Sequence, residues 1–306
     1  LELLEFDIDG AGNSVYQQSQ QALSDLLKRG RCGLLVDYPQ TDGGASIAAM
    51  RAQGIKPTVT KYTALDIINW HSEKIGGQML LTLVVLSEIV QVPVVGNPFA
   101  VTDVQQYRAL RLIDGVYTVE VWRDGAIVET YEPRQSNGQA WPIIPFMFVG
   151  AESNTPDSTA IPLESIATVN LHHYLNSADY EDSVYRVGQV QPYISGLDAE
   201  WRDHLEKTGV RIGSPTALML PQGGQFGFAQ AQPNMLPKEG MADKIKLMQS
   251  LGAKLIESGG VAKTATQDRS EQRAQHSVLS LCVSNLNEAY TQSLRWCAMF
   301  MGASED

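Results

Sequence analysis

Residues 107–131 read YRALRLIDGVYTVEVWRDGAIVETY. Apolar and polar side chains alternate within the three runs 107–113, 116–123 and 126–131, and an Asp-Gly pair separates each run from the next. Alternation with a period of two is typical of a strand with one buried face, and Asp-Gly favours the tight turn of a β-hairpin. The stretch therefore predicts a three-stranded antiparallel meander.

The residues around this meander predict a mixed α/β region. A helix is expected from Asn13 or Ser14 to about Lys28, because a capping side chain precedes it and Gly30 follows it. Four further apolar runs predict strands, which are Cys32–Pro39, Pro57–Tyr62, Leu80–Gln91 and Pro142–Val149.

The second half of the chain has helical periodicity instead. Long helices are predicted at Pro162–Val187, Pro237–Glu257 and Thr266–Met301, and Cys282 and Cys297 lie on the apolar stripe of the last one. Between the first two, the sequence predicts a short helix capped by Asp198 and two short strands, Ala217–Leu220 and Phe226–Ala229. Strands and helices in separate blocks indicate the α+β class.

Composition excludes several classes of protein. The 306 residues carry a formal net charge of −11, whereas a protein that coats nucleic acid needs a cationic surface. Three cysteines without a Cys-x-x-Cys pair exclude a disulfide framework and a cysteine zinc site, and they fit a reducing compartment. No apolar run is long enough to span a membrane. Because the sequence begins with Leu1, we expect it to be a segment of a longer protein.

The catalytic and metal-binding motifs that we sought are missing from the sequence. It contains no phosphate-binding P-loop, HExxH, GxSxG or dinucleotide glycine fingerprint. Asp7-Ile8-Asp9-Gly10 resembles the start of a calcium loop, but Gln18 stands where the bidentate Glu is needed. His172 and His173 are adjacent on a predicted helix and point about 100° apart, so they do not share a metal easily. We therefore predict no catalytic residues, no metal and no cofactor.

Residues 238–273 differ from the rest in charge. They carry seven basic and five acidic side chains, in a chain that is acidic overall. A solvated helix face is the ordinary explanation of such a segment. A local contact with DNA is the alternative.

Eleven short segments along nearly the whole chain occur in a characteristic order, which is Phe6–Ser14, Leu26–Gly30, Gly33–Pro39, Asp66–Trp70, Tyr107–Leu112, Ile144–Phe146, Pro162–Leu163, Asn170–Tyr174, Ser177–Tyr180, Ile212–Leu218 and Ala289–Trp296. In this order they resemble tailed-phage portal proteins. The resemblance is closer to a branch known only as a phage domain of unknown function.

This resemblance implies a portal-like α+β architecture. The expected parts are a wing with the antiparallel meander (residues 1–160), a first stem helix (161–187), a small α/β clip (188–236), a second stem helix (237–257), a channel loop (258–267) and a long wing helix (268–306). The crown and the usual N-terminal portion of such proteins are expected to be missing from this sequence.

The resemblance also implies a structural protein of the virion rather than an enzyme. Portals form a ring, usually of twelve subunits, at one capsid vertex, and the ring is the channel for DNA packaging and ejection. The implied partners are other copies of the chain, non-specifically contacted double-stranded DNA, terminase, a tail adaptor, the major capsid protein and scaffolding protein, with no membrane. The implied location is the virion, preceded by the host cytoplasm during assembly.

Two other hypotheses remain beside the portal. The chain could be another ring component of the head–tail junction, such as an adaptor or connector. It could also be an enzyme of unrecognised type that uses the sheet of residues 57–149.

The implied DNA-channel residues are few. By the resemblance, Lys263, Thr264 and Thr266 lie in the channel loop that touches DNA, and Lys254 and Arg269 lie beside it. Strong binding to phosphate would hold the duplex in place, so an acidic subunit with a few basic groups fits a channel through which DNA slides.

The first prediction concerns Lys263. Replacing it with Ala removes a positive charge from the expected channel loop, so DNA packaging or retention should fall while rings remain intact. The measurement is the DNA content of particles assembled with Lys263→Ala. Unchanged DNA filling would contradict a role for this residue.

Overall fold

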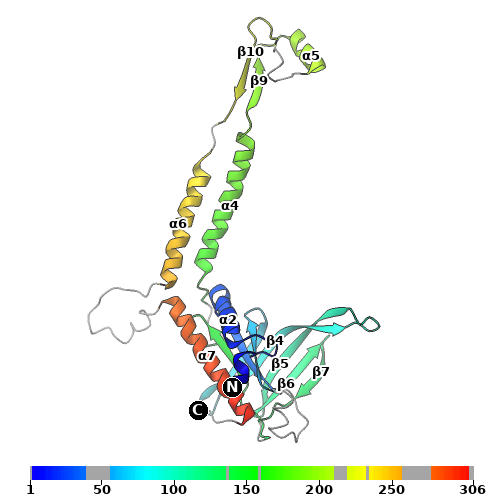
Figure 1. Cartoon of the computed structure of the whole chain (residues 1–306), viewed down its shortest axis with the longest axis vertical. Coiled ribbons are helices and arrows are strands. Elements are labelled where there is room, and N and C mark those ends of the chain that lie inside the picture. Colours follow the sequence, from blue (N-terminus) through cyan, green and yellow to red (C-terminus); the bar gives the residue numbers. More distant parts are fainter. Residues whose placement is uncertain are drawn as a thin grey trace, which may run out of the picture. The chain divides into compact units, whose positions relative to one another are not determined.

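The computed structural model describes residues 2–38, 56–135, 138–157, 160–209, 219–231, 234–256 and 277–302. The chain divides into two compact units (Figure 1). The first comprises Leu1–Glu164 and Gly252–Asp306, and the second comprises Ser165–Leu251. Helices occur with antiparallel sheets, so the predicted α+β class is confirmed.

A three-stranded sheet forms the middle layer of the first unit. Its order is β2-β1-β8, with the bounds β1 Arg31–Asp37, β2 Thr58–Thr63 and β8 Phe146–Gly150. Helices α2 (Val15–Arg29) and α7 (Val278–Met301) contact its strands and each other. Every side chain of β1 from Cys32 to Val36 is buried, as expected for a strand covered on both faces.

A five-stranded antiparallel sheet forms another layer of the first unit. Its order is β3-β4-β5-β6-β7, with the bounds β3 Ile67–Ile75, β4 Gln78–Pro93, β5 Val101–Ile113, β6 Val116–Arg123 and β7 Ala126–Tyr131. The last three strands are the predicted meander. Asp114 and Asp124 both have a φ of 50°, and the glycine after each also has a positive φ, as the turn type of a two-residue hairpin requires.

Aromatic side chains join the two sheets. Trp70 of β3 packs edge-on against Phe148 of β8, with ring centroids 5.6 Å apart, and Phe148 packs edge-on against Phe146 at 5.1 Å. Gly33 of β1 lies beneath this cluster, where an added Cβ atom would be 2.2 Å from the ring of Phe146. The middle sheet therefore has the helices on one face and the larger sheet on the other.

Helix α2 begins and ends at the predicted signals. The Ser14 hydroxyl accepts a hydrogen bond from the Gln17 amide, and the Gln17 side chain accepts one from the Ser14 amide. Gly30 ends the helix with a left-handed φ of 79°. A short helix, α1 (Glu2–Glu5), precedes it.

The acidic loop before α2 is satisfied internally. Asp9 accepts hydrogen bonds from the amides of Ala11 and Asn13, and Asp7 accepts one from the Gly12 amide. Lys56 donates to the Asp7 carboxylate at 2.7 Å. These contacts hold the pKa of Asp7 below its ordinary value, with the Lys56 hydrogen bond as the largest cause. The contacts favour a structural role for the loop.

Helix α7 is shorter than predicted. It begins at Val278, because Ser277 is extended and its hydroxyl accepts a hydrogen bond from the Ser280 amide as an N-cap. The expected start near Thr266 is therefore wrong for this helix, and residues 257–276 lie outside the described part of the chain. Cys282 and Cys297 are buried on its apolar face, as predicted.

The second unit contains two long helices and a small distal module. Its elements are α4 Glu164–Val187, β9 Gln191–Ser195, α5 Ala199–Thr208, β10 Gln225–Ala229 and α6 Leu236–Ile256. The first residue of α4 and the last five residues of α6 belong to the first unit. The distal strand pair differs from the prediction. β10 pairs with β9, whereas Met219 and Leu220 lie outside any strand and residues 217–218 are not described.

The second prediction tests the close packing of the two sheets. Gly33→Ala should lower the free energy of unfolding by about 1–3 kcal/mol, because the new methyl group overpacks the buried Phe146 ring. Gly252→Ala in α6 is the matched control, since an added Cβ there meets nothing within 4 Å and alanine favours a helix. Denaturant unfolding measures both. Equal stability of Gly33→Ala and the wild type would contradict this packing.

Candidate functional site

Helices α4 and α6 lie side by side within the second unit (Figure 1). One close approach involves Gly240 of α6, where a Cβ atom would be 2.8 Å from the Asn176 side-chain amide of α4. Glycine at this point leaves room for the Asn176 side chain. The helices have 24 and 21 residues, so they form a long paired surface.

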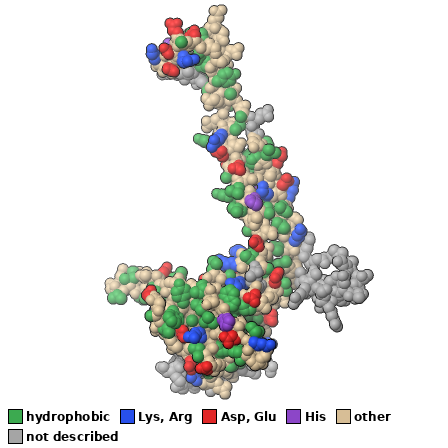
Figure 2. All heavy atoms as spheres, turned by 180° about the vertical axis from the view of Figure 1, so that it is seen from behind, with side chains coloured by type: hydrophobic (Ala, Val, Ile, Leu, Met, Phe, Trp, Pro, Cys, Tyr) green, Lys and Arg blue, Asp and Glu red, His purple; other side chains and the backbone are tan. Residues whose placement is uncertain are grey.

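This helical pair leaves its apolar side chains uncovered. Among the described residues, none in α4 or α6 is buried. The large exposed apolar side chains are Leu171, Tyr174, Leu175, Val184 and Tyr185 of α4, and Leu236, Ile245, Leu247 and Ile256 of α6. Figure 2 shows hydrophobic side chains among charged ones over this part of the chain. Several large apolar side chains exposed along one helical pair indicate an interaction site.

The two helices carry opposite net charge. Helix α4 has four acidic side chains and one basic side chain, whereas α6 has four lysines and two acidic side chains. Two ion pairs form within single helices, Arg186 with Asp182 at 2.9 Å and Lys246 with Asp243 at 3.4 Å. Their partners are well exposed, so these pairs contribute little to stability. The helical pair therefore presents an acidic side and a basic side as well as apolar side chains.

Only one predicted DNA-channel residue lies within the described part of the chain. Lys254 is exposed in the last turn of α6. Lys263, Thr264, Thr266 and Arg269 lie outside the described residues. Their expected role stays a prediction.

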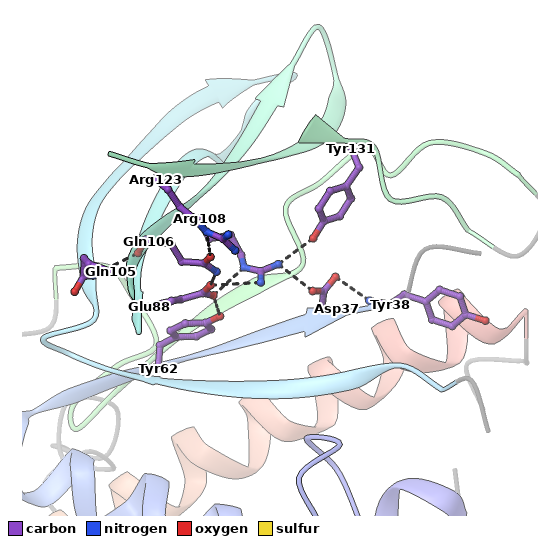
Figure 3. A network of polar contacts seen from close by, with 9 residues as sticks. All are labelled: Asp37, Tyr38, Tyr62, Glu88, Gln105, Gln106, Arg108, Arg123 and Tyr131. Carbon is purple, nitrogen blue, oxygen red and sulfur yellow. Dashed lines mark hydrogen bonds and ion pairs between the residues drawn. The ribbon is translucent and has the colours of Figure 1, made fainter. Parts of the chain in front are cut away.

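A polar network joins the two sheets of the first unit (Figure 3). Arg108 of β5 lies at its centre, and its guanidinium donates to Glu88 at 2.8 Å, to Asp37 at 3.2 Å and to the Tyr131 hydroxyl at 2.9 Å. The Tyr62 hydroxyl donates to Glu88 Oε1 at 2.6 Å, the same oxygen that accepts from Arg108 Nε. The network therefore connects side chains from five strands, which are β1, β2, β4, β5 and β7.

The network was not predicted from the sequence. The sequence does contain a signal for it. Glu88 of β4 and Arg108 of β5 lie on the same inward face of these neighbouring strands as the buried Leu86 and Leu110. Opposite charges at inward positions of neighbouring strands indicate a buried pair. Such a signal becomes visible only when the register of β4 against β5 is known.

Protonation in the network follows burial and the position of Arg108. Burial alone would raise the pKa of Glu88, but hydrogen bonds and charge from Arg108, with hydrogen bonds from Tyr62 and Gln106, hold it below its ordinary value. Burial raises the pKa of Asp37, and the more distant Arg108 contact offsets this only in part. Burial likewise raises the pKa of Tyr131 to about 12. The arrangement is a neutralising cluster that fixes the sheets.

Several other chemically capable groups in the described part of the chain are also satisfied or inert. An open pocket of about 480 Å³ lies between α2 and β2, where Asp25 forms ion pairs with both Arg29 and Lys61. Burial raises the pKa of Cys32 and of Cys297 to about 12, so these thiols stay protonated at neutral pH. The described residues hold no cluster of His, Cys, Asp and Glu suited to a metal. They also hold no helix with the length and apolar character of a membrane span.

Comparisons with known proteins bear mainly on the second half of the chain. Residues 162–301, a little under half of the chain, match the model of a family described as a domain of unknown function, DUF4055. This confirms, for that span, the expected resemblance to a domain without an assigned function. No curated protein matches the sequence.

One solved structure to which the chain is similar is described as "Neck of native GTA particle computed with C12 symmetry". The two chains are 15% identical, with a TM-score of 0.45 over 99% of this chain and 71% of the other. The portal resemblance stays a prediction.

The third prediction concerns the polar network. Arg108→Met should lower the free energy of unfolding by about 3 kcal/mol at pH 7, because Glu88 and Asp37 remain buried without their cation. Without Arg108, both carboxyls should have a pKa in the folded chain above their ordinary value. Stability is then lost as pH rises from the ordinary pKa of the unfolded chain to the raised pKa of the folded chain. The deficit relative to the wild type should therefore grow between about pH 4 and pH 7.

Arg134→Met is the matched control for this measurement. Arg134 pairs with Glu132 at 3.0 Å, and both side chains are about half exposed, so the loss should stay within about 0.5 kcal/mol. Denaturant unfolding across the pH range tests both variants. A deficit for Arg108→Met that does not change with pH would contradict the network.

Proposed function

We propose that this chain is a portal protein, one subunit of a ring at a capsid vertex through whose channel DNA is packaged and ejected. The observation that carries the proposal is the helical pair α4 and α6, whose apolar side chains are unburied along two long helices. Copies of the chain arranged in a ring would bury these side chains between neighbours. The resemblance of the chain to portal proteins supports this choice among ring-forming proteins.

Opposite charges on the two helices also support a ring. A closed ring needs heterologous contacts, in which one face of a subunit meets a different face of the next. An acidic α4 of one copy and a basic α6 of its neighbour would complement each other in such a contact. Two copies that met through the same helix would instead bring like charges together.

The remaining roles follow from the portal proposal. The ring would hold about twelve subunits, and DNA would pass through it without sequence-specific contacts. Terminase, a tail adaptor, the major capsid protein and scaffolding protein would be its partners in the virion. The protein would act as a structural component and not as an enzyme.

A second candidate is another ring component of the head–tail junction, such as an adaptor. The exposed helical pair supports assembly in both cases. The small α/β module between α4 and α6 supports the portal, for which a clip between two stem helices is expected.

The fourth prediction tests assembly through the helical pair. Electron microscopy of the purified protein should show rings with a central hole, and light scattering should give a mass of about twelve subunits. Leu171→Ser with Tyr174→Ser should raise the concentration needed for assembly about tenfold or more, because both side chains are more than half exposed in the single chain. Thermal unfolding of the unassembled chain should stay unchanged.

The matched control keeps the apolar character of these positions. Leu171→Met with Tyr174→Phe should assemble like the wild type. Wild-type protein that stays monomeric at high concentration and beside scaffolding protein would contradict the proposal. Rings that form equally well with both serine substitutions would exclude this face of α4 from the contact.

A further inference from the structure

The hairpin of β4 and β5 extends beyond the strands that flank it. β4 pairs with β5 as far as Pro93 and Val101, whereas β3 pairs with β4 only up to Leu86 and β6 pairs with β5 only up to Tyr107. Residues 89–104, hereafter the arm, are therefore a two-stranded ribbon with both edges unpaired in the described part of the chain. Figure 1 shows this ribbon projecting from the five-stranded sheet.

The arm is apolar on its faces and at its tip. Val95 and Phe99 in the connecting loop are 101% and 97% exposed, which means that they touch almost nothing in the single chain. Ile89 and Val101 on the strands are 69% and 56% exposed. Figure 2 shows hydrophobic and uncharged side chains over this projection. A two-stranded ribbon in water is marginally stable by itself, so this sequence fits an arm that another surface covers.

The tip is ordered rather than frayed. The Val94 amide donates to the Ala100 carbonyl at 3.0 Å, the Asn97 amide to the Val94 carbonyl at 3.1 Å, and the Ala100 amide to the Asn97 carbonyl at 3.2 Å. The Asn97 side chain also accepts from the Phe99 amide at 3.1 Å. These bonds present Phe99 in a fixed conformation, which lowers the entropy cost of binding.

We infer that the arm docks on a neighbouring copy of this chain. Charge supports this occupant over nucleic acid, because no Lys or Arg occurs between Lys74 and Arg108, and phosphate contacts need such groups. The arm carries one charged side chain, Asp103, which accepts a hydrogen bond from Gln91 at 3.2 Å. It is therefore a surface of low charge on an acidic protein.

A surface of low charge lets two like-charged copies meet without repulsion. With a formal net charge of −11 per chain, most of the surface opposes contact between copies, and the arm does not. Apolar contacts of this kind are typical of permanent assemblies, in which the covered surface is never exposed again. A neighbour at a fixed position in a ring satisfies that condition. This inference rests on the proposed function.

The fifth prediction tests the arm by crosslinking. A photoreactive p-benzoylphenylalanine in place of Phe99 should join neighbouring copies in assembled wild-type-like rings, giving dimers and higher multimers on a denaturing gel. Val95→Ser with Phe99→Ser should raise the concentration needed for assembly about tenfold, with unchanged thermal unfolding of the single chain. Val95→Ile with Phe99→Leu is the control that keeps the tip apolar, and it should assemble normally.

The outcomes separate this inference from the portal proposal. If wild-type rings form but Phe99 never crosslinks two copies and the serine variant assembles normally, the inference is overturned while the ring stands. Crosslinking of Phe99 to a different protein of the particle, and not to a second copy, would also overturn it. If the wild type forms no assembly of any kind, both proposals fail together.

Discussion

The apolar side chains of α4 and α6 impose the main constraint on this molecule. The described part of the chain covers them only in part, since no residue of either helix is buried. Packing of an amphipathic face supplies most of the stability of a helix in a protein. Helices of 24 and 21 residues without such packing depend on contacts from outside the chain. Assembly is therefore part of how this sequence folds, in our account.

The first unit, by contrast, is stabilised by packing within the chain. Its two sheets and the helices packed on them bury a continuous apolar core, and Arg108 pairs with both carboxylates between the sheets. Breaking a buried pair of this kind is costly, so the network holds the sheets in a single arrangement. A rigid unit of this type suits a position in a ring, where small errors in each subunit would add up around the circle.

Local signals in the sequence predicted much of the fold. The two Asp-Gly pairs determine the meander because their positive φ angles match the twist of the strands, and the caps of α2 act within one turn. The errors came from other sources. Ser277 was not recognised as an N-cap, and 29 residues of sequence separate β9 from its partner β10.

The candidate site was predicted less completely than the fold. The apolar stripes of the two long helices were visible from periodicity, but their exposure depends on what the rest of the chain leaves uncovered. The Arg108 network required the register of strands far apart in sequence. For the expected channel residues, the structure describes only Lys254.

Hydrogen–deuterium exchange, followed as a function of protein concentration, tests the central claim most directly. In the unassembled chain, the amides of α4 and α6 should exchange far faster than those of the buried strand β1. On assembly, exchange in α4 and α6 should slow by at least about tenfold, while β1 stays unchanged. Equal exchange in α4 and α6 before and after assembly would contradict the account, because their apolar faces would then remain uncovered.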